Sequence, residues 1–223
     1  AMAGMVGVDL PGHGQSDGKR GHIRSYAITD EMIDSLLDQC SKTFPGIPLF
    51  LYGHSLGGGM VLDYMLRKNP PVKGAIVTSP WLKLSFEPEK SKIRLAGIMK
   101  NILPSLVQSS GLVVDHLSRD REVVEKYKKD PLVHGLISVS LFHSAMTAAS
   151  RSLHNASSLG KPLLLMHGTD DRICSSEGSR EFAEKTPLAE LRLWEGAYHE
   201  LHNDLCRHEV FDTIRNWLET KLS

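Results

Sequence analysis

Cysteine is scarce in this 223-residue chain, which contains only Cys40, Cys174 and Cys206. An odd number of cysteines without regular spacing does not form a disulfide framework, so we expect a reducing, cytoplasmic setting. A surplus of charge is also missing, because 26 lysines and arginines balance 26 aspartates and glutamates. The sequence therefore gives no reason to expect a nucleic acid as partner.

Long apolar runs are absent as well. No segment approaches the ~18 consecutive apolar residues that cross a bilayer. The first five residues lack the charged flank and the long apolar stretch of a signal peptide. The hydrophobic content of 41% is ordinary for a globular protein. We expect one substantial core, with room for a small subdomain.

Five short apolar runs predict β-strands at residues 5–10, 49–52, 74–78, 163–167 and 191–194. Several of them are nearly continuous, which is typical of strands buried on both faces of a parallel sheet. Apolar residues at helical spacing separate the runs, notably in residues 28–40, 56–65 and 210–218. The alternation of strand and helix predicts an α/β fold with a mostly parallel sheet.

The alternation stops between residues 81 and 159, where helical patterns occur without clear strands. We interpret residues 81–159 as an inserted helical cap, and residues 1–80 with 160–223 as the α/β core. Within this cap, residues 94–106 predict an amphipathic helix that Pro104 should end or kink.

One face of this cap helix is apolar and consists of Leu95, Ile98, Met99, Ile102 and Leu103, and the nearby basic residues are Lys92, Arg94 and Lys100. Such a face could contact a membrane peripherally and draw in lipid. It could equally pack on the body of the protein and roof an acyl tunnel. We favour packing, because amphipathic helices usually bury their apolar face against the domain.

The motif G-x-S-x-G occurs at residues 53–57, between an apolar strand and an amphipathic helix. This context is typical of a nucleophile elbow, in which a sharp turn exposes a serine at the carboxyl end of a sheet. We expect strained backbone angles at Ser55, with glycine needed at both Gly53 and Gly57 to avoid clashes. The alternative is a plain hydroxyl in a tight turn.

A serine nucleophile needs a base, and the base needs an acid that orients it. In this kind of fold they follow in the order serine, acid, histidine, each after a late strand. Residues 163–172 give a strand, a glycine turn and the carboxylates Asp170 and Asp171, whose spacing does not decide between them. Residues 191–199 give a strand, a glycine turn and His199.

His202, three residues after His199, could line the pocket or act as the base instead. The stretch HELH at residues 199–202 is not the H-E-x-x-H pattern, and no third ligand is evident. We therefore expect neither a metal nor another cofactor.

Several further motifs run from near the first residue to near the last: DLPGHGQSDG at 9–18, FPGIP at 44–48, GHSLGG at 53–58, LSR at 117–119, KDPL at 129–132, HGTDDRIC at 167–174 and EGAYHELH at 195–202. Together they resemble the monoacylglycerol lipase family of serine α/β-hydrolases. The resemblance implies Ser55, Asp171 and His199 as catalytic triad, and it favours Asp171 over Asp170 because the family's acid directly precedes an Arg-hydrophobic-Cys step.

The resemblance also implies roles around this triad. The backbone N–H of Leu56 would donate to the oxyanion, His202 would face the glycerol end of the substrate, and Tyr127 would lie where the cap closes. Cys174 would lie near the pocket wall, although a small buried apolar role is the simpler interpretation.

The chain departs from the family upstream of the elbow. Family members have a strand that ends in His-Gly and a loop that supplies the second oxyanion donor, and the sequence shows neither. In the family this strand lies between those represented here by residues 6–10 and 49–52. We therefore expect that the N-terminal part of the sheet is missing and that two strands lack their shared neighbour.

The resemblance implies a serine hydrolase that cleaves the ester of a small lipid, a monoacylglycerol, to fatty acid and glycerol through an acyl-enzyme. The nearest alternative is a lysophospholipase or a general carboxylesterase. An alternative of another class is a catalytically silent homologue that binds a lipid or a protein, and the missing oxyanion loop favours it.

Overall fold

The computed structural model describes residues 4–86 and 90–222, without the side chains of residues 90–93 and 95. This part of the chain forms two compact units, and each is described by itself. Within the described residues, the first contains residues 4–47, 90–112 and 129–147, and the second contains residues 48–86, 113–128 and 148–222. The division into a core and a cap at residues 81 and 159 follows chain order rather than compactness, and it stays a prediction.

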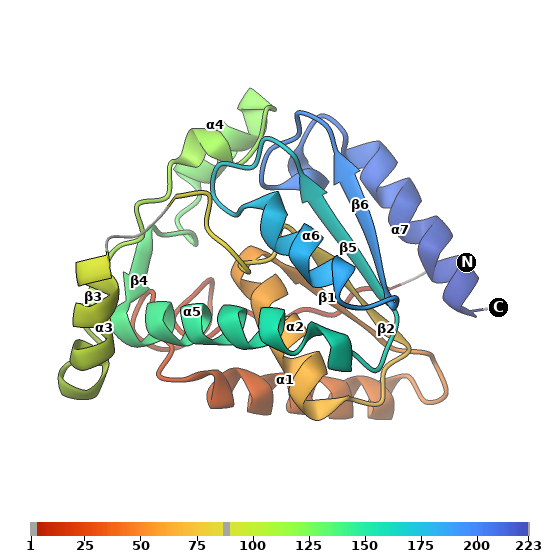
Figure 1. Ribbon diagram of the computed structural model, residues 1–223, viewed down its shortest axis with the longest axis horizontal. Helices are drawn as coiled ribbons and strands as arrows, with labels where there is room; N and C mark the ends of the chain where they lie inside the picture. The colour runs from red at the N-terminus through yellow and green to blue at the C-terminus, as the bar shows by residue number, and fades with distance from the viewer. Residues whose placement is uncertain (1–3, 87–89, 223) are drawn as a thin grey trace. The chain divides into compact units, whose positions relative to one another are not determined.

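The second unit is built on a four-stranded sheet (Figure 1). Its strands are β1 Phe50–His54, β2 Gly74–Thr78, β5 Leu163–Gly168 and β6 Ala189–Trp194. They lie in the order β1-β2-β5-β6, and every neighbouring pair is parallel. Four of the five predicted strands and the predicted parallel sheet are thereby confirmed.

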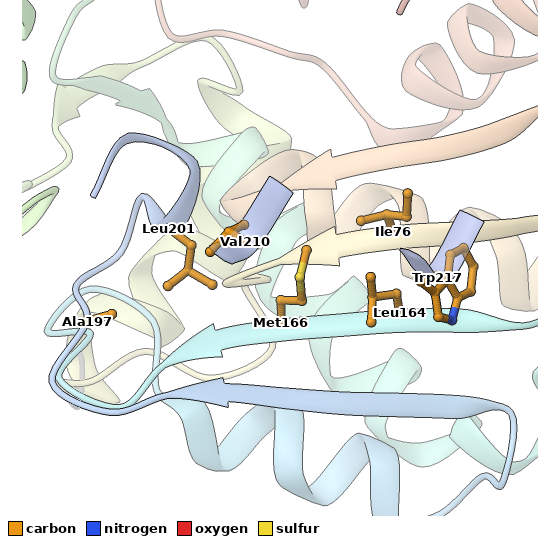
Figure 2. Packing of buried hydrophobic residues seen from close by; sticks show 7 residues of the cluster. All are labelled: Ile76, Leu164, Met166, Ala197, Leu201, Val210 and Trp217. Carbon is orange, nitrogen blue, oxygen red and sulfur yellow. The ribbon is translucent and has the colours of Figure 1, made fainter. Parts of the chain in front are cut away.

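Helices cover both faces of this sheet. Val77 of β2 faces α2 Ser55–Lys68, since a Cβ at Gly58 would lie 3.0 Å from its side chain. Ile76, on the opposite face, packs with Trp217 of α7 Arg207–Leu222. Figure 2 shows this second layer, a buried cluster of Ile76, Leu164, Met166, Ala197, Leu201, Val210 and Trp217. β2 and β5 are buried along their whole length, which explains why these two strands are continuous apolar runs in the sequence.

The predicted strand at residues 5–10 is wrong, because these residues adopt no regular secondary structure. Met5, Val6 and Val8 are all exposed. A β-strand needs a neighbour that accepts and donates backbone hydrogen bonds, and within the described residues this segment pairs with none.

The first unit contains α1 Tyr26–Thr43 and α3 Lys90–Ile102. Both agree with the predicted helices, and α3 ends just before Pro104 as expected. The strands β3 Val107–Ser109 and β4 Leu136–Ser138 form an antiparallel pair. No pattern in the sequence predicted these two strands.

The remaining elements are η1 Val114–His116, α4 Arg121–Lys129, α5 Val139–His154, η2 Ala156–Ser158, α6 Ser176–Glu184 and η3 Leu201–Asn203. α5 begins in the first unit and ends in the second. No helix among the described residues is both long and apolar enough to span a bilayer.

The apolar face predicted on α3 is largely exposed. Ile98 is 60% exposed and Ile102 63%, and Leu103 beyond the helix is also exposed, so the expected packing is wrong for these side chains. α3 approaches the His143 ring of α5 at Gly97, and Ile98 and Ile102 project about 100° and 140° around the helix from that contact. The side chains of Lys92 and Leu95 lie outside the described residues.

Candidate active site

Ser55 is the first residue of α2 and directly follows β1. Its φ of 53° lies in the left-handed region, which is unfavourable for any residue except glycine. Residues with such strained backbone angles are often found at functional sites. A Cβ at Gly53 would lie 2.6 Å from the carbonyl oxygen of Gly57, so the predicted need for glycine at position 53 is confirmed. The same prediction is wrong for Gly57, because a Cβ there would project into open space.

Asp171 and His199 form a buried hydrogen-bonded pair. Nδ1 of His199 lies 2.7 Å from Oδ2 of Asp171, and the two residues are only 3% and 7% exposed, respectively. Asp170 is exposed instead. Of the two carboxylates that the sequence left open, Asp171 is the one that contacts the histidine.

The backbone around His199 is fixed by contacts to β5 and to the residue after β2. Gly168 at the end of β5 leaves no room for a side chain, because the carbonyls of Ala197 and Tyr198 lie directly against it. The hydroxyl of Ser79 donates to the carbonyl of His199 over 2.7 Å. The sequence alone does not point to Ser79, since nothing in a serine after a strand indicates its hydrogen-bond partner.

The carboxylate of Asp171 accepts hydrogen bonds at both oxygens. Oδ1 accepts from the backbone N–H groups of Ile173 at 2.8 Å and Cys174 at 3.0 Å. Oδ2 faces His199 and also Nε2 of His167 at 3.1 Å. Burial alone would raise the pKa of Asp171, but the hydrogen bonds from the two histidines hold this pKa well below its usual range. The carboxylate therefore stays ionised.

The hydroxyl of Ser55 makes a hydrogen bond with the thiol of Cys174. This thiol is fully buried, and burial followed by the charge of Asp171 raises its pKa well above the usual value. The sulfur is therefore a neutral S–H group and not a competing nucleophile. Within the described part of the chain, Ser55 makes no hydrogen bond to His199. Catalytic hydrogen bonds of this kind are often long without substrate and shorten only when the substrate binds.

Three imidazole rings gather beside the elbow. The ring of His54 lies 4.7 Å from that of His199 and 4.8 Å from that of His202. Nδ1 of His54 lies 2.9 Å from the hydroxyl of Thr78, and the phenol of Tyr52 lies 3.2 Å from the same hydroxyl and 3.4 Å from Nδ1 of His202. The structure thus brings the predicted His202 into the site.

The side chains of Tyr52, His54 and His202 are uncharged near neutral pH. Burial, then the neighbouring His199 and His202, lower the pKa of His54 well below its usual value. Burial also lowers the pKa of His202. The carboxylate of Glu200 opposes this change, and the neighbouring His199 adds to it. Burial raises the pKa of the Tyr52 phenol. The surface next to His199 is therefore polar but neutral.

Acid should weaken this fold, because the folded protein keeps His54 neutral while the unfolded chain protonates it below a pKa of about 6.5. The contribution is complete above that pH and is lost as the pH falls below it. We expect the free energy of unfolding, measured in urea, to decrease as the pH is lowered from about 7 to 5. In His54→Gln the same plot of unfolding free energy against pH should have a smaller slope. Equal slopes in the two proteins would contradict this assignment.

The two remaining predicted residues lie on helices. Leu56 is the second residue of α2, and its N–H belongs to the first turn, where no intrahelical acceptor exists. Tyr127 lies on α4 and is half-buried. Their roles toward the substrate stay predictions.

Comparison with known proteins identifies the family of this chain. The family described as serine aminopeptidase, S33, matches residues 3–206. Human monoglyceride lipase is 31% identical over 97% of this chain and 76% of its own length. Phospholipase YtpA of Bacillus subtilis is 32% identical over 93% of this chain and 81% of its own.

A third relative, an abhydrolase domain-containing protein of Dictyostelium discoideum, is 32% identical over 96% of this chain, which spans only 23% of that protein. The crystal structure of a monoacylglycerol lipase from Paleococcus ferrophilus superimposes with a TM-score of 0.88 at 36% identity, over 96% of this chain and 82% of its own. This chain therefore belongs to the monoacylglycerol lipase family, whose members are carboxylic-ester hydrolases with the α/β-hydrolase fold.

Proposed function

We propose that this chain hydrolyses the ester of monoacylglycerols to a fatty acid and glycerol, with Ser55, Asp171 and His199 as its catalytic triad. The observation that carries the proposal is the buried hydrogen bond between Asp171 and His199, next to a serine in a strained turn. The three residues follow the strands of one parallel sheet in the chain order typical of α/β-hydrolases.

In the first half of the reaction, the Ser55 hydroxyl turns from Cys174 to Nε2 of His199, which takes its proton as Oγ bonds to the acyl carbon. The carbonyl oxygen becomes an oxyanion, and the N–H of Leu56 donates to it. The C–O bond to glycerol then breaks, and the protonated His199 returns its proton to the glycerol oxygen. Glycerol leaves, and the acyl group stays on Ser55.

In the second half, water replaces glycerol. His199 takes a proton from the water while the water oxygen attacks the acyl carbon. The bond between Oγ of Ser55 and the acyl carbon then breaks, and His199 returns the proton to Ser55. The fatty acid leaves. Throughout both halves, ionised Asp171 stabilises the imidazolium and keeps its Nδ1–H oriented.

The neutral groups beside the elbow support glycerol as the leaving group. The imidazole of His202 and the phenol of Tyr52 can each donate or accept a hydrogen bond without carrying a charge, which suits glycerol hydroxyls. A phosphodiester would instead favour cationic partners such as arginine. We propose Tyr52 and His202 as the groups that bind the glycerol end.

A second candidate is a lysophospholipase, and the similarity to a phospholipase of Bacillus subtilis favours it. Monoacylglycerol and lysophosphatidylcholine with the same acyl chain, together with a p-nitrophenyl ester, separate the candidates. We expect kcat/KM for monoacylglycerol to exceed that for the lysophospholipid by ~10-fold or more. A reversed order would favour the phospholipase, and equal values for all three esters a general carboxylesterase.

If both lipids are presented in vesicles, the same experiment also tests whether the protein binds to a membrane surface. We also propose peripheral membrane contact, which the exposed side chains of Ile98, Ile102, Leu103 and Leu106 support. Cosedimentation of the protein with the vesicles is the measurement, and no protein in the pellet would count against this contact.

A further inference from the structure

His167 is a second histidine on the carboxylate of Asp171. It lies near the end of β5 and is fully buried. Its Nε2 lies 3.1 Å from Oδ2 of Asp171 and 3.0 Å from the carbonyl oxygen of Cys174. Its Nδ1 lies 2.8 Å from the hydroxyl of Ser179 on α6. Both ring nitrogens therefore have partners, and neither reaches solvent.

These partners define the tautomer of His167. Nε2 faces two atoms that only accept hydrogen bonds, a carboxylate and a carbonyl, so Nε2 carries the hydrogen. In the neutral ring Nδ1 is then an acceptor, and the Ser179 hydroxyl donates to it. Ser179 is itself fully buried, which leaves its hydroxyl no solvent as an alternative partner. The chain Ser179, His167, Asp171, His199 is thus continuous and directional.

The contact matters because Oδ2 of Asp171 is shared. The same oxygen accepts from Nδ1 of His199 over 2.7 Å and from Nε2 of His167 over 3.1 Å. The other oxygen is held by the two backbone N–H groups. His167 adds a second hydrogen bond at Oδ2, so rotation of the carboxyl group would break hydrogen bonds to both histidines and to the backbone. This extra contact helps to keep the carboxylate directed toward His199.

We propose that His167 is a positioning residue for hydrolysis, which holds the Asp171 carboxylate in the orientation that directs His199 toward Ser55. The inference rests on the proposed function in one respect, that His199 is the base. The pKa of Asp171 gives support, since the hydrogen bond from His167 is first among the effects that lower it against burial.

Four variants test the role. His167→Leu removes the donor while keeping an apolar side chain, and His167→Gln keeps an N–H donor close to the position of Nε2. Ser179→Ala removes the donor to Nδ1. Ser152→Ala is the matched control, because Ser152 is equally buried and its hydroxyl has no partner within the described part of the chain.

Two readouts distinguish positioning from general stability. The first is kcat and KM for monoacylglycerol, and the second is the low-field proton resonance of Nδ1–H of His199, which needs no turnover. We expect His167→Leu to lower kcat by about 10- to 100-fold at similar KM and to displace the resonance. His167→Gln should recover most of both, Ser179→Ala should show a smaller shift, and Ser152→Ala none.

Parental kcat and an unmoved resonance in a cooperatively melting His167→Leu protein would overturn the proposal. If this variant does not fold, Ser179→Ala decides: a displaced resonance supports the role, and an unmoved resonance with parental kcat overturns it. If the parent protein hydrolyses no monoacylglycerol, the proposed function fails. The resonance then still decides whether His167 positions Asp171 and His199.

Discussion

Ser55→Ala should lower kcat for monoacylglycerol hydrolysis by about 10⁴- to 10⁶-fold, because the variant has no oxygen to form the acyl-enzyme. The free energy of unfolding should change little. The recorded partner of the hydroxyl is a neutral thiol, and such a bond contributes weakly. Initial rates and urea midpoints of the two proteins are the measurements.

A fluorophosphonate gives the same test without a substrate. The parent should gain the mass of one adduct, while Ser55→Ala and a heat-treated parent should gain none. Hydrolysis at the parental rate by Ser55→Ala would end the serine assignment. A parent that melts cooperatively yet takes no adduct would favour the catalytically silent homologue.

Asp171→Asn should lower kcat by about 10³- to 10⁴-fold. The side chain of Asp171 is surrounded by four hydrogen-bond donors: the ring N–H groups of His167 and His199 and the backbone N–H groups of Ile173 and Cys174. Either orientation of an asparagine amide turns its NH₂ group toward N–H donors. When the NH₂ group faces the two histidines, His199 keeps a hydrogen bond to it only with its hydrogen on Nε2, where it can no longer take the proton of Ser55.

The same conflict should destabilise the fold by about 1–3 kcal/mol, because it leaves a buried donor unpaired. Asp170→Asn is the matched control: the neighbouring carboxylate is exposed, so both kcat and the urea midpoint should stay near parental values. If Asp170→Asn lost activity and Asp171→Asn kept it, the acid would be misassigned.

The sequence predicted the elements that have strong local patterns. The strand and the glycine turn before Ser55, before Asp171 and before His199 could each be predicted. The strand before Asp171 is buried and therefore a continuous apolar run, whereas the strand before His199 alternates apolar and polar residues. Parallel strands end at one edge of the sheet, so the meeting of Asp171 and His199 also followed from chain order.

What the sequence did not predict depends on contacts between distant segments. β3 and β4 are three residues each, and in the part of the chain that the structure describes they form a two-stranded sheet of their own, so neither has a pattern long enough to recognise. The segment at residues 5–10 has the composition of a strand but no neighbouring strand among the described residues. His167 was read as the last residue of an apolar run, since its role depends on Ser179 and Asp171 rather than on its neighbours in sequence.

Chain topology also has a consequence for how activity appears during folding. The elbow follows β1, Asp171 follows β5 and His199 follows β6, and the pair β2–β5 joins segments far apart in the chain. Parallel pairing of this kind closes long loops before it gains contacts, and so it forms slowly. The helices can therefore form before the catalytic residues are brought together. The return of esterase activity on refolding then reports when the strands of the sheet have paired.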